Sequence, residues 1–158
     1  MRHFIGYAEA AVDPKGRLAM PQRFRRLLHP EDSETFIVGR GLDGELWGFP
    51  IVVWKHLSEK IRTLQPTNPY DRRQRNYHRR FTQESEECRL DPQGRLLLPP
   101  KLREKAKIAG RAVVAGSLDW LEFWEPKAYA EFRVKNDPAA EKGADEIDLS
   151  PRSAPAEG

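Results

Sequence analysis

Hydrophobic and polar residues form a series of short segments, and the same series occurs twice along the chain. In the first half, stretches rich in β-branched and aromatic residues predict short strands separated by turn residues. Asp43-Gly44 lies between the last two stretches, and Asp-Gly is typical of a tight hairpin turn. We therefore expect two β-hairpins from neighbouring strands, residues 4–12 with 17–20 and residues 35–40 with 45–49.

Apolar residues at helical spacing follow a proline at two places in the first half. Proline suits the first turn of a helix, and apolar residues three or four positions apart lie on one helix face. A short helix is predicted after Pro21 and a longer one after Pro50. These helices would bury Phe24, Leu27 and Leu28 behind Pro21, and Trp54, Leu57, Ile61 and Leu64 behind Pro50.

A sequence motif repeats in register with this pattern. Asp13-Pro14-Lys15-Gly16-Arg17 returns 78 positions later as Asp91-Pro92-Gln93-Gly94-Arg95, and apolar residues, a proline and a basic segment follow both copies. Self-similarity of this kind indicates two homologous units of about fifty residues. We expect the second unit to copy the first, with strands near 84–90, 95–98, 112–116 and 120–124 and helices starting at Pro99 and Pro126.

The length of the chain requires the two units to share a core. At 158 residues the chain is one small domain or two very small ones, and a fifty-residue unit alone buries only a modest part of its surface. We expect a mainly antiparallel β core with short helices around it. The expected organisation is a first repeat at 3–54, a helical linker at 55–82, a second repeat at 83–134 and a disordered acidic tail at 135–158.

The sequence shows neither a secretory signal nor a membrane-spanning segment, and this sets the expected cellular location. The N-terminus lacks a basic segment followed by a long apolar run, and no apolar stretch approaches the length of a membrane span. Cys88 is the only cysteine, which excludes an intrachain disulfide. We expect a cytoplasmic protein without a membrane partner.

Charge is distributed unevenly. Residues 1–81 carry a net charge of +6, residues 82–136 carry +1 and residues 137–158 carry −4. A basic body favours an anionic partner but does not name it. The arginine run from Arg72 to Arg80 is either a second nucleic-acid surface or a solvated helix face whose Arg79 and Arg80 pair with Glu84 or Glu86, and we favour the helix face.

The repeated turn has both a structural and a functional interpretation. Asp at the first position accepts backbone hydrogen bonds, Pro presets φ and Gly accommodates a positive φ, so turn chemistry explains Asp13, Gly16, Asp91 and Gly94. It does not explain the arginine after each glycine. Such an arginine could reach a phosphate or a guanine edge while the aspartate orients it, although a structural salt bridge remains a competing explanation.

With these motifs the chain resembles the MraZ family of bacterial transcriptional regulators. The likeness covers nearly all of residues 3–134 and includes residues 39–44, Trp54 and the helix opened by Pro99. It implies a mainly β fold with short α-helices, in which two swapped-hairpin halves of the SpoVT-AbrB type form one pseudo-twofold β-barrel core. It also implies an oligomeric ring, association with the nucleoid, and binding of double-stranded DNA at repeated promoter sites upstream of the division and cell-wall gene cluster.

In this family the Asp-x-x-x-Arg motif carries the DNA contacts, and a β-ribbon of this size fits the major groove. We expect Arg17 and Arg95 to contact base edges, with Lys15 and Gln93 assisting. The phosphate candidates Arg23, Arg25, Lys101 and Arg103 are equally well explained as a solvated helix face. Because Gln93 stands where the first copy has Lys15, the two turns are not chemically equivalent on DNA. From the charge imbalance we expect the first repeat to contribute more to binding.

Enzymatic functions find little support in the sequence. His3, His29, His56 and His78 are scattered without metal-ligand spacing, no phosphate loop or nucleophile elbow occurs, and no carboxylate stands in a clearly apolar setting. We expect no catalytic residue, metal, cofactor or small-molecule substrate. The four tryptophans are expected in the core or a subunit interface. Two alternatives remain open, an RNA-binding protein and a self-assembling protein-interaction module in which the turns are only turns.

Overall fold

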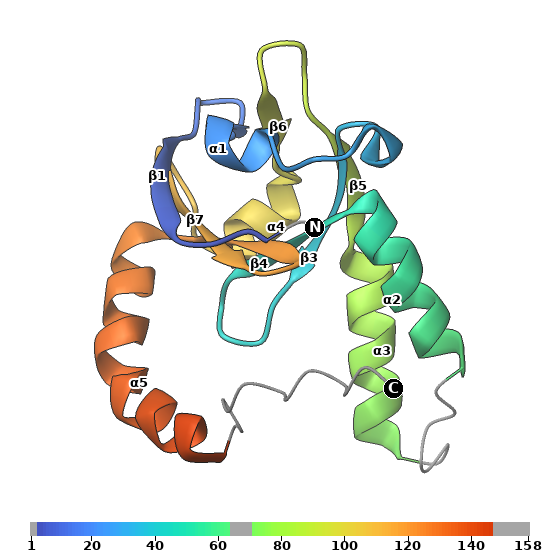
Figure 1. Cartoon of the computed structure of the whole chain (residues 1–158), viewed down its shortest axis with the longest axis vertical. Coiled ribbons are helices and arrows are strands. Elements are labelled where there is room, and N and C mark those ends of the chain that lie inside the picture. Colours follow the sequence, from blue (N-terminus) through green and yellow to red (C-terminus); the bar gives the residue numbers. More distant parts are fainter. Residues whose placement is uncertain (1–2, 64–70, 147–158) are drawn as a thin grey trace, which may run out of the picture. The chain divides into compact units, whose positions relative to one another are not determined.

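Eight strands form the body of the chain in the computed structural model, which describes residues 3–63 and 71–146 (Figure 1). Six strands make an antiparallel sheet in the order β1-β7-β8-β4-β3-β5, while β2 and β6 pair as a separate two-stranded sheet. Their bounds are Tyr7–Ala11 (β1), Arg17–Ala19 (β2), Thr35–Arg40 (β3), Leu46–Pro50 (β4), Glu86–Arg89 (β5), Arg95–Leu97 (β6), Arg111–Ser117 (β7) and Trp120–Trp124 (β8).

The two repeats exchange their first strands. Strand β1 of the first repeat pairs with β7 of the second, and β5 of the second repeat pairs with β3 of the first. Replacing each strand by its counterpart in the other repeat reverses the order of the six-stranded sheet, so the topology has pseudo-twofold symmetry. Neither repeat has a complete sheet without the other, which confirms the expectation of a mainly β fold with short helices built from two halves.

The predicted hairpin of residues 4–12 and 17–20 is wrong in its pairing. Between these segments only the single bridge Val12 to Leu18 forms, because β1 pairs along its whole length with β7 and β2 pairs with β6. The second predicted hairpin, β3 with β4, is confirmed. Strands β1 and β5 remain the edges of the described sheet, so its pairings do not close it into the expected barrel.

Short helices connect the strands. The helix predicted behind Pro21 is a single turn, and Leu27 and Leu28 follow its end, half-buried against the core. The helix predicted behind Pro50 is present, a further helix precedes β5, and the predicted core residue Leu64 lies outside the described residues. The bounds are Gln22–Arg25 (α1), Pro30–Asp32 (a 3-10 turn, η1), Ile51–Thr63 (α2), Arg72–Glu84 (α3) and Pro100–Lys105 (α4).

A shared hydrophobic core lies between the two repeats. Its fully buried side chains come from both halves, and Phe4 contacts Phe24 edge to face with centroids 5.9 Å apart. The largest are Phe4, Phe24, Phe36, Phe123, Leu18, Leu46, Leu96, Leu98 and Leu121. Burial of this size in one cluster is the main source of stability for a chain too short to build two separate cores.

Helices α2 and α3 add an aromatic cluster on the sheet. Phe49 of β4 lies 5.6 Å from Trp120 of β8, and Trp54 of α2 lies 5.5 Å from Phe81 of α3, as centroid distances. Trp47 joins the same cluster and Trp124 is buried in the sheet. The tryptophans therefore serve packing in this chain, as expected.

The residues after Pro126 form a second unit, and the described part of this unit belongs to helix α5 (Pro126–Glu146). This helix continues into the segment for which the sequence predicted disorder from residue 135 onward, while residues 147–158 lie outside the described part. Ala139, Ala140, Glu141 and Lys142 are strong helix formers and favour the continuation in spite of Pro138 inside the helix. Among the described helices none is long and apolar enough to cross a membrane.

Candidate nucleic-acid interface

The first turn is closed by its aspartate. The Oδ1 of Asp13 accepts hydrogen bonds from the backbone N–H groups of Lys15 (3.0 Å) and Arg17 (2.9 Å). The Gly16 N–H donates to the Asp13 carbonyl at 2.9 Å, and Gly16 has φ +88°. Only glycine adopts this φ without strain, so the residue types of the motif fit the geometry of the turn.

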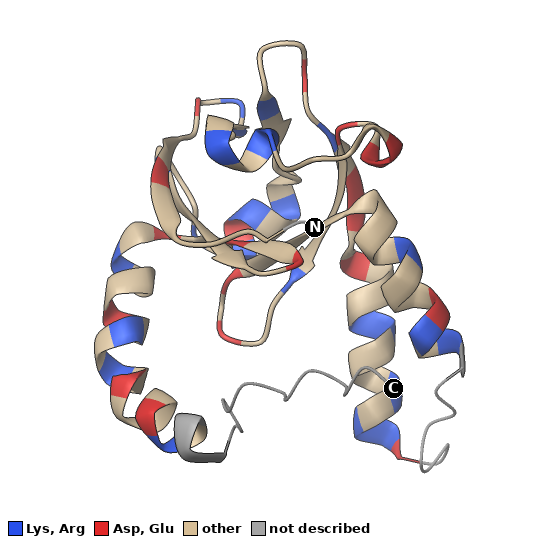
Figure 2. Cartoon of the chain, viewed as in Figure 1, with Lys and Arg blue, Asp and Glu red and all other residues tan. Residues whose placement is uncertain are grey.

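The second turn repeats the first bond for bond. Asp91 Oδ1 accepts from the backbone N–H groups of Gln93 and Arg95, both at 2.9 Å. Gly94 has φ +77° and donates to the Asp91 carbonyl at 2.9 Å. Figure 2 shows acidic and basic residues together on each of the two turns. The likeness in sequence is therefore matched by a likeness in local structure.

Each aspartate also holds the arginine of its own motif. Arg17 Nε donates to Asp13 Oδ2 at 2.5 Å, and Arg95 Nε donates to Asp91 Oδ2 at 2.8 Å. The backbone N–H and then the guanidinium of the arginine lower the pKa of each aspartate. The salt bridge considered from the sequence is thus present, and it orients each guanidinium through its Nε edge.

The two turns are linked through Arg95. Its Nη1 lies 3.9 Å from Asp13 Oδ2 of the other turn, and its Nη2 donates to Gln93 Oε1 at 2.9 Å. Both motif arginines keep about a third of their side-chain surface exposed, 33% for Arg17 and 31% for Arg95. The sequence-predicted base-contacting residues therefore belong to one continuous charged surface.

Strands β2 and β6 form a ribbon that carries both arginines on one face. Residues opposite each other in an antiparallel pair share a face, and here Arg17 lies opposite Leu97 and Ala19 opposite Arg95. Leu18 and Leu96 point to the other face and are completely buried. We call the outward set, Arg17, Ala19, Arg95 and Leu97, the ribbon face. Leu97 and Ala19 were missed in the sequence, although period-two alternation through Leu96, Leu97 and Leu98 indicates that Leu97 is exposed.

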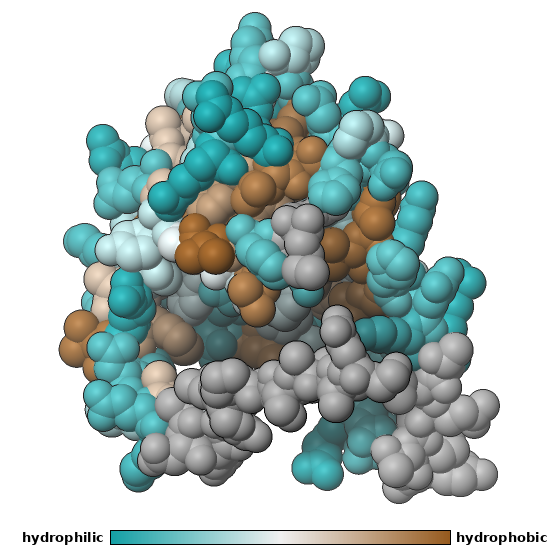
Figure 3. Space-filling view, in the orientation of Figure 1, coloured by the Kyte–Doolittle hydropathy of each residue, from teal (hydrophilic) through white to brown (hydrophobic). Residues whose placement is uncertain are grey.

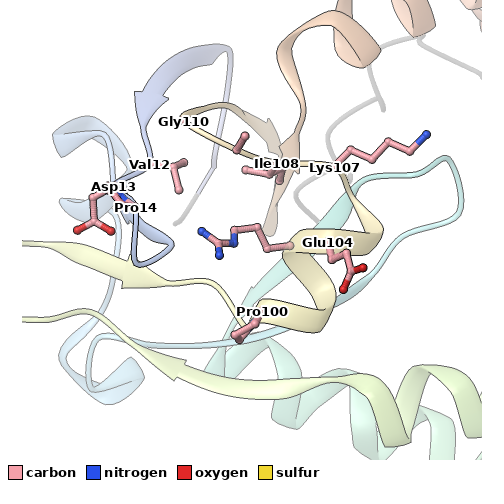
Figure 4. A pocket seen from close by; sticks show the side chains of 10 residues that line it. Val12, Asp13, Pro14, Pro100, Glu104, Lys107, Ile108 and Gly110 are labelled. Carbon is pink, nitrogen blue, oxygen red and sulfur yellow. The ribbon is translucent and has the colours of Figure 1, made fainter.

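Each turn packs on the arginine of the other repeat. A Cβ on Gly16 would lie 2.8 Å from Nη1 of Arg103, and a Cβ on Gly94 would overlap the guanidinium of Arg25. Figure 4 shows Asp13 and Pro14 of the first turn lining one pocket with Pro100 and Glu104 of α4. The exchange of strands thus places α4 of the second repeat beside the turn of the first.

The remaining predicted residues lie in different settings. Arg23 Nη2 donates to the Tyr7 carbonyl at 2.5 Å, and its guanidinium lies 4.9 Å from the centre of the Phe24 ring, while the residue itself remains exposed. Lys15, Gln93 and Lys101 are exposed. The structure thus gathers Lys15, Arg17, Arg25, Gln93, Arg95 and Arg103 at the two turns.

The arginine run lies on α3, as the helix-face interpretation expects, but its ion pairing differs. Glu84 pairs with Arg40 of β3 at 3.2 Å, whereas Arg80 donates to the Gly41 carbonyl at 3.4 Å. Strand β3 competes for Glu84 because α3 packs on it.

Two groups bear on enzymatic chemistry. Burial raises the pKa of the Cys88 thiol to about 12, which leaves it protonated at neutral pH. Glu45 is only 2% exposed, and burial raises its pKa, as do the nearby Glu122 and Asp43 carboxylates, while the Asp43 backbone N–H donates to its Oε1 at 3.2 Å. No group of three or more His, Cys, Asp and Glu in the described residues could hold a metal ion.

Comparison with known proteins places the sequence in a family. The MraZ family model, described as "MraZ protein, putative antitoxin-like", matches residues 3–76 and 81–149. A "Transcriptional regulator MraZ" from Heliobacterium modesticaldum is 37% identical over 145 residues, 91% of this chain and 96% of the relative. Proteins of the same name from Desulfitobacterium hafniense strain Y51 (38% identity, 91% and 96% coverage) and Lactiplantibacillus plantarum (35%, 84% and 89%) are similar to it.

Proposed function

The chain belongs to the MraZ family, and from this premise we propose that it is a sequence-specific DNA-binding transcriptional regulator. The relatives that it matches are named transcriptional regulators, and the match covers almost the whole length of each. The regulator acts in the cytoplasm at the nucleoid, on repeated sites upstream of the division and cell-wall gene cluster. We infer these DNA targets from the membership of the chain in the family.

The observation that carries the proposal is the ribbon face. A two-stranded β-ribbon fits the major groove, where arginine is the residue best suited to guanine edges. Arg17 and Arg95 lie on the same face, and each is oriented by a carboxylate through Nε. In our proposal the two guanidinium groups contact base edges, and Lys15 and Gln93 at the tips of the turns assist them.

Phosphate contacts position the ribbon. Arg25 and Arg103 each lie against the turn of the other repeat, where they support the turn and add positive charge beside the groove. Exposed Lys101 on α4 supplies a further contact. Contacts of this kind raise affinity for any sequence and leave discrimination to the ribbon face.

Useful affinity requires several copies of the chain. One ribbon offers few contacts, whereas several ribbons on linked subunits engage several DNA repeats with a high effective concentration. We therefore propose that the regulator is a homo-oligomer, a ring in keeping with the family, and that the spacing of the DNA repeats matches the spacing of its subunits.

Fluorescence anisotropy tests this function on labelled duplex DNA from upstream of the chain's own gene, beside a shuffled duplex and a matched RNA. We expect preference for the native duplex and an affinity that falls as salt rises. The double variant Arg17→Ala, Arg95→Ala should lose at least about tenfold in affinity for the native duplex, because each base-edge contact is worth about 1–3 kcal/mol.

A matched control removes the same charge elsewhere. Lys55 and Arg62 are exposed on α2, far along the chain from both turns, so Lys55→Ala, Arg62→Ala should keep the preference for the native duplex. Equal losses in the two double variants would reduce the effect to net charge. Equal binding to all three nucleic acids, unchanged by Arg17→Ala and Arg95→Ala, would favour a protein-interaction module.

A further inference from the structure

One large apolar side chain, Leu97, stands on the charged ribbon face. Leu97 is 52% exposed, although its neighbours Leu96 and Leu98 are fully buried. The surface near the turns is mostly hydrophilic (Figure 3). An exposed leucine is common on proteins and needs no explanation by itself. Its position between two oriented arginines, on the face proposed to meet DNA, does need one.

The leucine makes the two halves of the ribbon unequal. Across the β2 and β6 pair, Leu97 lies directly opposite Arg17, whereas Ala19 lies opposite Arg95. The turns beside them are otherwise matched in hydrogen bonds and in backbone conformation. The pseudo-twofold ribbon thus presents an arginine beside a leucine in one half and an arginine beside an alanine in the other.

Resting on the function proposed above, we propose that Leu97 is a specificity-determining residue that contacts the 5-methyl group of thymine. That methyl is the apolar feature of the base edges in the major groove. Side chains opposite each other in an antiparallel pair lie about 4.5–5.5 Å apart. Because base pairs stack about 3.4 Å apart, Leu97 meets a base pair next to the one that Arg17 contacts.

The shorter Ala19 leaves the other half of the ribbon more tolerant of the neighbouring base. Its single methyl ends nearer the backbone than the branched end of a leucine side chain, so it buries less of a thymine methyl. The ribbon therefore distinguishes its own two ends on DNA, and this polarity sets the direction in which each chain lies on a site that need not be palindromic.

Replacing thymine by deoxyuridine in the native duplex tests the proposal. The exchange removes the 5-methyl group and keeps every base-edge donor and acceptor. Wild-type protein should bind the deoxyuridine duplex about fourfold more weakly for each contacted thymine, the loss expected for one methyl-sized group. Leu97→Ala should weaken binding to the thymine duplex by a similar factor and lose most of the difference between the two duplexes.

The reciprocal variant is Ala19→Leu, which gives the first strand the residue of the second. Because position 19 is exposed, the substitution fits without repacking, and we expect a larger penalty for deoxyuridine than in the wild type. Together the two variants measure the methyl preference at each end of the ribbon.

Three outcomes would overturn the assignment: equal binding of both duplexes by the wild type, a thymine preference that Leu97→Ala leaves undiminished, or a change of oligomer mass in Leu97→Ala by light scattering. The last would place Leu97 at a contact between copies. Failure of the proposed DNA-binding function can be told apart from failure of the Leu97 assignment, because it appears as an unchanged duplex preference in the double variant Arg17→Ala, Arg95→Ala.

Discussion

At the scale of single residues, each aspartate of the repeated motif combines two tasks in one carboxylate. One oxygen of Asp13 accepts two backbone N–H groups and closes the turn, while the other receives Nε of Arg17. Asparagine would preserve the first task, because its carbonyl also accepts backbone hydrogen bonds, but it would lose the charge that holds the guanidinium. The salt bridge and the DNA contact are therefore compatible interpretations of one geometry.

The stability of the turns should depend on pH through these carboxylates. Hydrogen bonds from the arginine lower the folded-state pKa of Asp13 and Asp91 below the unfolded value near 4. Their contribution is therefore complete above about pH 4 and is lost as the pH falls through the lowered folded-state pKa. We expect Asp13→Asn, Asp91→Asn to be less stable than wild type at pH 7, with a gap that narrows at pH 3 in urea unfolding.

A matched variant tests whether the loss of stability is specific to the turn carboxylates or common to any surface ion pair. Glu9→Gln breaks the exposed pair with Arg111, whose atoms lie 2.9 Å apart, and such pairs contribute about 0–1 kcal/mol. It should leave stability at pH 7 nearly unchanged. A gap between Asp13→Asn, Asp91→Asn and wild type that stays constant from pH 7 to pH 3 would contradict the role given to the two carboxylates.

At the scale of elements, the sequence predicts which segments are strands but not which strands pair. Residues 35–40, 45–49 and 120–124 were placed within about a residue of β3, β4 and β8 because alternation and turn residues are local signals. Strand β1 could pair with β2 or with β7 on the same pattern. Since the two repeats carry equivalent strands, local pattern does not distinguish pairing within a repeat from exchange between repeats.

The exchange of β1 depends on a close approach at Gly116. Its N–H donates to the Gly6 carbonyl at 2.8 Å, and a Cβ there would overlap the backbone of Phe4 and Ile5. Backbone atoms do not move aside as a flexible side chain would, so Gly116→Ala should cost about 1–3 kcal/mol in urea unfolding, the usual cost of overpacking. Gly110→Ala, with nothing near its Cβ, is the control and should lie within about 0.5 kcal/mol of wild type.

The same limits explain which parts of the candidate site were found. Asp13, Arg17, Asp91 and Arg95 were found because the motif occurs twice, and the structure brings both copies together on one surface. The contacts of Arg23 with Tyr7 and Phe24 were not predicted, since they arise from packing that no local pattern records. Leu97, for which a role is proposed above, was not predicted because the repeated motif is defined by its turn and charged residues. For the Gly116 prediction, a loss of stability in Gly110→Ala as large as that in Gly116→Ala would contradict the packing argument.

At the scale of the whole molecule, pseudo-twofold symmetry gives two turns of equal shape and unequal charge. The first turn has Lys15 at its tip, with an ammonium group available to a phosphate. The second has Gln93, whose Oε1 accepts from Arg95 and so supports that arginine without adding charge. One chain therefore presents a more basic half and a less basic half to the same duplex, which is the physical basis for expecting unequal contributions.

The salt dependence of DNA binding should report this inequality. If Lys15 contacts a phosphate, Lys15→Gln reduces the slope of log K against log[salt] by about 0.9 per bound chain, whereas Gln93→Ala leaves the slope unchanged. Arg17→Ala should also weaken binding to the native duplex more than Arg95→Ala, because Arg17 acts beside the lysine and opposite Leu97. Anisotropy titrations from low to physiological salt measure both effects, and Lys55→Ala on α2 controls for the loss of one charge. Equal losses from Arg17→Ala and Arg95→Ala, with a slope indifferent to Lys15, would mean that the two halves contribute alike and that shape, rather than charge, governs how the ribbon meets DNA.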